Sequence, residues 1–156
     1  MSENVRAEGS GTPAVERVVV GVDASEASKE ALRWAARYAT FVGARLEVVH
    51  AWHPAEEYAW VQSLPPPAEP TEVAGKALAE LVHEVIEPGP TLDVSTTIVR
   101  GHAVKVLTQS AKGASLLVLG DRGFGGFDGM LLGSISEKCA AHAPCSIVIV
   151  RRDDAD

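Results

Sequence analysis

Apolar residues along the chain fall into short runs that alternate with longer amphipathic stretches. The first run, Arg-Val-Val-Val-Gly-Val-Asp at 17–23, is apolar on both faces, which is typical of a central strand in a parallel sheet. Asp23 closes this run, so the pattern places a carboxylate at the C-terminal end of a buried strand. Similar runs predict further strands at 45–52, 92–99, 115–119 and 146–150.

Helical periodicity fills most of the intervals between these runs. In the clearest case an alanine recurs at every fourth position from Ala27 to Ala39, which predicts an amphipathic helix to about Val42, ended by Gly43. Ser25 is the expected cap of this helix, with Ser28 as the alternative start. Further helices are expected at 71–87, at 102–112 and from 134 to the proline at 144.

This alternation predicts an α/β, Rossmann-like domain, in which helices cover both faces of an open, essentially parallel five-stranded sheet. If the chain winds outward through three strands and then returns beside the first, the first and fourth strands become neighbours at a switch point. A ligand then belongs at their carboxyl ends, where Asp23 and the segment from Gly120 lie. We expect the domain to span 16–151, between a mobile tail at 1–15 and a short tail at 152–156.

Prolines interrupt the stretch 53–70 so densely that regular structure is not expected there. The stretch also carries Tyr58 and Trp60, so it suits a lid or a partner-facing surface, although packing against the domain surface is the interpretation we prefer.

Composition and charge narrow the choice of partners and compartment. The formal net charge of −7 argues against nucleic acid and anionic membranes as partners of the whole molecule. No apolar stretch is long enough to span a bilayer, and the N-terminus has no secretory signal, so a cytoplasmic location is expected. The spacing of Cys139, Cys145 and the five histidines indicates neither a disulfide scaffold nor a zinc site.

The most informative stretch runs from Gly120 to Ser136. It follows a predicted strand, precedes a predicted helix and carries glycines at 120, 123, 125, 126, 129 and 133. Backbone N–H groups of such a loop, together with the positive end of the helix, converge readily on an anion. The sequence therefore predicts a phosphate-binding loop.

Three familiar loops do not match this stretch. A P-loop needs a lysine before the serine, whereas Gly133-Ser134 has none. The dinucleotide fingerprint fails at the first turn, and in the fourth turn Asp128 stands where its third glycine is required. A receiver domain would carry an acceptor aspartate after the third strand, where Arg100-Gly101 stands.

The remaining pattern is Gly120, two residues, Gly123, nine residues, then Gly133-Ser134, and it resembles the nucleotide-binding signature of the universal stress protein family. The resemblance covers nearly the whole folded chain. It includes Val-Gly-Val-Asp-Ala-Ser at 20–25, Val-Val-His-Ala-Trp at 48–52, Leu-Leu-Gly-Ser-Ile-Ser at 131–136 and Pro-Cys-Ser-Ile-Val-Ile-Val at 144–150.

This resemblance implies an ATP-binding domain with strand order 3-2-1-4-5 that commonly forms homodimers through the last strand. It implies that Asp23 contacts the nucleotide near ribose and adenine, and that the Ala51 backbone meets adenine. The positions that would hold phosphates and ribose are Gly120, Gly123, Gly133, Ser134 and Ile135. The predicted nucleotide-binding set also includes Gly21, Arg122, Gly125 and Ser136.

Several side chains near the loop keep two interpretations. Ser134 is expected as the N-cap of the last helix. Arg122, the only cation in the loop, either offsets phosphate charge or is a solvated surface residue. Asp121 and Asp128 either face away from the phosphates, or one of them helps to hold Mg²⁺, so the predicted cofactor is ATP with or without Mg²⁺. Ser136 either binds nucleotide or lies on the helix surface.

No convergent base, nucleophile or metal cluster is apparent, so no catalytic or metal-binding residue is predicted. We expect ATP to act as a regulatory ligand with slow or no hydrolysis in a stress-response protein. An ATP-using enzyme, such as an adenylate-forming one, is an alternative, although its Ser-Gly-Gly-rich first loop is missing at Gly21-Val22-Asp23. A protein-interaction module with an empty site is the other. The stress signal, the regulatory partners and the choice among ATP, AMP and cyclic nucleotides stay open.

The last predicted strand, Ser146 to Val150, is apolar on both faces and ends the sheet in the proposed order. An exposed edge strand of this kind invites pairing with another chain. The sequence thus gives its own reason to expect a homodimer.

Overall fold

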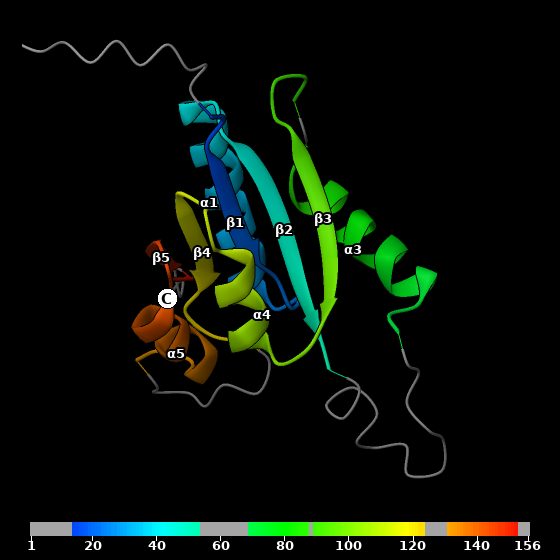
Figure 1. Cartoon of the computed structure of the whole chain (residues 1–156). Helices are drawn as coiled ribbons and strands as arrows, with labels where there is room; N and C mark the ends of the chain where they lie inside the picture. The colour runs from blue at the N-terminus through cyan, green and yellow to red at the C-terminus, as the bar shows by residue number, and fades with distance from the viewer. Residues whose placement is uncertain (1–13, 54–68, 88, 124–130, 153–156) are drawn as a thin grey trace, which may run out of the picture.

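Five parallel strands form one sheet in the order β3-β2-β1-β4-β5, which confirms the predicted topology (Figure 1). The computed structural model describes residues 14–53, 69–87, 89–123 and 131–152. The strands are β1 (Arg17–Gly21), β2 (Arg45–Trp52), β3 (Val94–Arg100), β4 (Leu116–Gly120) and β5 (Ser146–Val150). The helices are α1 (Glu26–Val42), α3 (Glu72–Val85), α4 (Ala103–Ser110) and α5 (Ser134–His142).

Helices cover both faces of the sheet, as the doubly apolar strands predict. One apolar cluster packs α1 and α3 against the face that carries Val18 and Val20, and a second packs α4 and α5 against the face that carries Val19 (Figure 1). Successive valines of β1 are therefore buried on opposite sides. No helix within the described ranges is long and apolar enough to cross a membrane.

Element ends agree with the sequence pattern to within two residues. β1 ends at Gly21, where its register with β2 stops, whereas the predicted strand continued to Asp23. β3 begins at Val94 and not at 92. Ser25, and not Ser28, is the N-cap of α1. Residues 54–68, on which the predicted lid or partner surface falls, lie outside the described part of the chain.

A close backbone contact brings α1 onto the end of β4. A Cβ built on Gly120 would lie 2.7 Å from the carbonyl carbon and oxygen of Ala27. Only a residue without a side chain allows this approach. The contact sets the C-terminal end of β4 beside the first turn of α1, and so beside Asp23.

We predict that Gly120→Ala lowers the free energy of unfolding by about 1–3 kcal/mol, because the added methyl group meets backbone that cannot rotate away. The matched control is Gly75→Ala in α3, where a Cβ meets nothing within 4 Å. That variant should gain about 0.5–1 kcal/mol from its better helix propensity. Urea unfolding measures both, and equal effects of the two changes would contradict the close contact.

Candidate functional site

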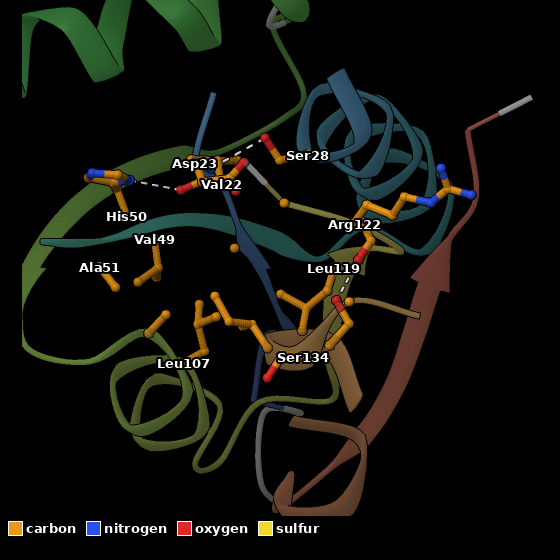
Figure 2. Close-up of a pocket in the computed structure, with 17 residues that line it drawn as sticks. Val22, Asp23, Ser28, Val49, His50, Ala51, Leu107, Leu119, Arg122 and Ser134 are labelled. Carbon is orange, nitrogen blue, oxygen red and sulfur yellow. Dashed lines mark hydrogen bonds between the residues drawn. The ribbon is translucent and has the colours of Figure 1, made fainter. Parts of the chain in front are cut away.

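A pocket of about 320 Å³ opens at the carboxyl ends of β1 and β4, where the order of the strands reverses (Figure 2). This is the place at which parallel α/β sheets bind ligands. It is lined by Gly21, Val22, Asp23, Ser28, Val49, His50, Ala51, Ala103, Leu107, Leu119, Gly120, Arg122, Gly123, Gly133, Ser134, Ile135 and Ser136.

The pocket brings together almost all of the residues predicted to bind nucleotide. Those that line it are Gly21, Asp23, Ala51, Gly120, Arg122, Gly123, Gly133, Ser134, Ile135 and Ser136. They come from three places far apart in the sequence: the turn after β1, the end of β2, and the two ends of the glycine-rich loop. Gly125 and Asp128 lie outside the described residues.

Asp23 sits in a tight turn that its own carboxylate holds together. Asp23 Oδ1 accepts hydrogen bonds from the Ser25 backbone N–H at 2.9 Å and from the Ser25 hydroxyl. Ser25 in turn caps α1 by accepting from the Ser28 N–H. Between them Ala24 has a φ of 65°, which is unusual for a residue with a side chain. Asp23 therefore fixes the cap of α1 through Ser25 and does not cap the helix itself.

The two ends of the glycine-rich loop are tied to each other. The Gly133 N–H donates to the Asp121 carbonyl at 2.6 Å, and the Ser136 hydroxyl donates to the Gly120 carbonyl at 2.6 Å. Ser136 is only 5% exposed, so it is not a helix-surface serine. Its hydroxyl proton is used within the protein, and it shapes the pocket by closing the loop.

The N-cap of α5 is Gly133, so the prediction of Ser134 as the cap was wrong. Gly133 keeps extended backbone angles, φ −69° and ψ 153°, while Ser134 is already the first helical residue. The first intrahelical bond runs from the Glu137 N–H to the Gly133 carbonyl. The N–H groups of Ser134, Ile135 and Ser136 therefore precede any intrahelical acceptor, and all three residues line the pocket.

Both helices that begin at the pocket lack a side-chain cap. His102 and Gly133, the N-caps of α4 and α5, make no capping hydrogen bond through a side chain. By contrast, Ser25 and Thr71 cap α1 and α3 through their hydroxyl groups. Uncapped N-termini keep unsatisfied N–H groups and partial positive charge, which favours an anion in the space they face.

Arg122 lines the pocket but turns its guanidinium away from it. Figure 2 shows the side chain extending away from Asp23, His50 and Ala51. It also borders a second cavity of about 180 Å³, beside the start of α1 and next to Arg152. In this arrangement Arg122 is directed away from the place where it would offset phosphate charge.

Asp121 is 7% exposed, and its Oδ1 atom has no hydrogen-bond partner. It borders the second cavity and not the pocket. No group of three or more histidine, cysteine or acidic side chains with metal-binding geometry occurs among the described residues. The described residues therefore place no cluster of carboxylates at the pocket of the kind that binds Mg²⁺.

Sequence reasoning missed the apolar wall of the pocket and the part played by His50. Val49, Leu107 and Leu119 form much of that wall together with Ala103, the first residue of α4. The available signal was the short helix after the third strand, which starts at the same edge of the sheet. His50 donates from Nδ1 to the Val22 carbonyl at 2.8 Å, a contact that no sequence motif indicates.

A comparison with protein families shows which family the chain belongs to. The family model described as the universal stress protein family matches residues 14–151. The chain belongs to the universal stress protein family.

Relatives within this family occur in Mycobacterium tuberculosis and Thermus aquaticus. A universal stress protein of Mycobacterium tuberculosis is 36% identical over 145 residues, which cover 88% of this chain and 48% of the relative. The chain thus spans about half the length of the mycobacterial relatives it matches. A universal stress protein of Thermus aquaticus is 33% identical over 141 residues, 86% of this chain and 97% of the relative.

Solved universal stress proteins share the fold. The UspA protein of Lactobacillus plantarum has a TM-score of 0.64 at 21% identity and covers 87% of this chain and 97% of its own. A universal stress protein in complex with cAMP has a TM-score of 0.61 at 24% identity, covering 88% and 97%. The protein from Archaeoglobus fulgidus in complex with dAMP has a TM-score of 0.55 at 16% identity, covering 86% and 96%.

Beneath the pocket of this universal stress protein lies a buried thiol. Cys139 on α5 is 0% exposed and packs in the cluster that contains Leu107 and Leu119. Burial raises the pKa of Cys139 to about 11. Burial also raises the pKa of Cys145, although that side chain is partly exposed.

We predict that iodoacetamide at pH 8 modifies Cys145 in the native protein and leaves Cys139 unmodified. With a pKa of about 11, only about one thousandth of Cys139 is thiolate at that pH, and the thiolate is the reacting form. Peptide mass spectrometry measures each site, and labelling in urea is the control that shows both thiols are intact. Modification of Cys139 in the folded protein at the rate of Cys145 would contradict its burial.

Proposed function

We propose that this chain binds an adenine nucleotide in the pocket at the ends of β1 and β4, with ATP as the candidate ligand. In this proposal the protein works in the cytoplasm and ATP acts as a regulatory ligand, with slow or no hydrolysis. The observation that carries the proposal is the uncapped N-terminus of α5, whose first N–H groups belong to residues that line the pocket. Such a terminus suits a phosphate group.

The remaining pocket residues fit the other parts of a nucleotide. Val49, Leu107 and Ala103 provide an apolar wall of the kind that suits a base, near the backbone of Ala51. Gly123 passes so close to Asp23 that a Cβ there would lie 2.8 Å from Asp23 Oδ2. The absence of a side chain at Gly123 keeps this narrow part of the pocket open to a ligand.

The named ligands of two solved family members support adenine as the base. One is in complex with cAMP and the other with dAMP, and these ligands share adenine and a phosphate group. ATP is preferred over a monophosphate for this chain because of the glycine signature from Gly120 to Ser134. Any Mg²⁺ would accompany the phosphates.

An ATP-using enzyme is the less favoured alternative. The titratable side chains among the described lining residues are Asp23, His50 and Arg122, and this set contains no lysine to engage a γ-phosphate. His50 donates to a backbone carbonyl, and Asp23 Oδ1 holds Ser25. Neither arrangement pairs a nucleophile with a base, so we propose at most weak ATPase activity. A protein-interaction module with an empty site is the other alternative.

Identification of the nucleotide retained on the purified protein distinguishes the proposed nucleotide binding from the enzyme and from the interaction module. Purified protein is denatured, and the released small molecules are separated and identified by chromatography and mass spectrometry. Retained ATP or AMP supports the proposal, and ATP turnover well above background would favour the enzyme. A protein that carries no nucleotide and shows no affinity for ATP, AMP or cAMP in calorimetry would refute nucleotide binding.

Gly123→Val is predicted to abolish ATP binding while the domain still folds. The new side chain meets the Asp23 carboxylate at 2.8 Å and fills the path proposed for the phosphates. The matched control is Gly89→Val, where a Cβ meets nothing within 4 Å. Calorimetry measures affinity, circular dichroism checks the fold, and unchanged ATP affinity in Gly123→Val would overturn the site assignment.

We also propose a homodimer built on β5, which forms one edge of the sheet. Its apolar residues remain partly exposed, and Ile149 packs against neither core cluster, unlike Ile147 and Val148. Sedimentation at micromolar concentration should give a dimer, and Ile149→Lys should give a folded monomer because a charge would be buried at the joined edges. A wild-type monomer under these conditions would rule out the dimer.

A further inference from the structure

The pairing between β1 and β2 stops one bond earlier than the backbone would allow. The register ends at Gly21 opposite Val49, and one more bond follows, from the Val22 N–H to the Val49 carbonyl at 3.0 Å. In a parallel ladder the next bond would run from the Ala51 N–H to the Val22 carbonyl. The bond found at that carbonyl comes instead from His50 Nδ1, at 2.8 Å (Figure 2).

The bond from His50 takes the place of a ladder bond from Ala51, and this matters because of the direction of the Ala51 backbone. In a parallel strand the N–H and C=O groups of alternate residues point to the same neighbour. Val49 pairs toward β1, and the Trp52 carbonyl accepts from Gly101 beyond β3, so the Ala51 backbone points to the side of β1. That side, beyond the end of β1, is the pocket that Ala51 lines.

We propose that His50 is a positioning residue that keeps the Ala51 backbone available to the nucleobase by taking the Val22 carbonyl as its own acceptor. The inference rests on the proposed nucleotide binding and adds to it the device that shapes its base end. A carbonyl only accepts, so His50 Nδ1 carries the hydrogen.

The same bond holds the turn that carries Asp23. The Val22 N–H donates to the Val49 carbonyl, and the Val22 carbonyl accepts from His50. The Asp23 N–H donates to the Ser28 hydroxyl oxygen at 3.3 Å. These contacts hold Ala24 at a φ of 65°, a conformation that needs support from its surroundings. Loss of the His50 donor would let the Val22 carbonyl turn to the Ala51 N–H, which closes the base end of the pocket and shifts Asp23.

A pair of variants tests this role. His50→Asn places an amide nitrogen where Nδ1 stands, because both atoms are bonded to Cγ, whereas His50→Leu has a similar size and no donor. Calorimetry should show that Leu weakens AMP and ATP binding by at least about tenfold, or ~1.4 kcal/mol, while Asn stays within about threefold of the wild type. Thermal unfolding of both variants checks that each is folded.

The amide exchange of Ala51, measured by NMR without nucleotide, gives a second readout. It should slow in His50→Leu, where the ladder gains the Val22–Ala51 bond, and remain fast in the wild type and in His50→Asn. Equal nucleotide affinity of Leu and wild type, Asn as weak as Leu, or unchanged Ala51 exchange in Leu would overturn the role of His50. Absence of any nucleotide binding by the wild type would refute the proposed function instead, and the exchange comparison would still decide whether His50 controls the end of the ladder.

Discussion

The direct backbone contact between α1 and the end of β4 determines where the parts of the pocket lie. Gly120 lets Ala27 approach to a distance that no other residue permits, so the turn after β1 and the loop after β4 share one space. Asp23 and Gly123 then meet across the reversal in strand order. A helix held further out by a side chain at 120 would separate these two segments, and the pocket would lose one wall.

The lack of side-chain caps on two helices explains why this space suits an anion. The protein satisfies the N-termini of α1 and α3 with serine and threonine side chains, yet it leaves those of α4 and α5 without side-chain caps at the pocket. The first N–H groups of a helix have no intrahelical acceptor, so two uncapped helix starts at one pocket favour a ligand that supplies acceptors there. Arg122 points away from this space, so the partial positive charge there belongs to the helix starts and not to that side chain.

Much of the fold was predictable because apolar periodicity reports burial directly. The alternating runs predicted the strands and helices, and the glycine pattern predicted the loop after β4. The details at the pocket depend on tertiary contacts that periodicity does not carry. At the end of β1 the His50 side chain from β2 bonds to the Val22 carbonyl. At the start of α5 the cap is Gly133 rather than Ser134, and the Gly133 N–H donates to the Asp121 carbonyl. The direction of Arg122 likewise depends on the cavity beside α1.

The two bonds that join the ends of the glycine-rich loop have a consequence for how such a protein can diverge. The bonds fasten β4 to α5, one from Gly133 to Asp121 and the other from Ser136 to Gly120. Neither bond involves residues 124–130. Substitutions or length changes between the fastened ends need not be transmitted to the sheet. Divergence of the loop sequence and stability of the scaffold are therefore separable traits in this architecture, and descendants whose loops have changed can inherit the same fold.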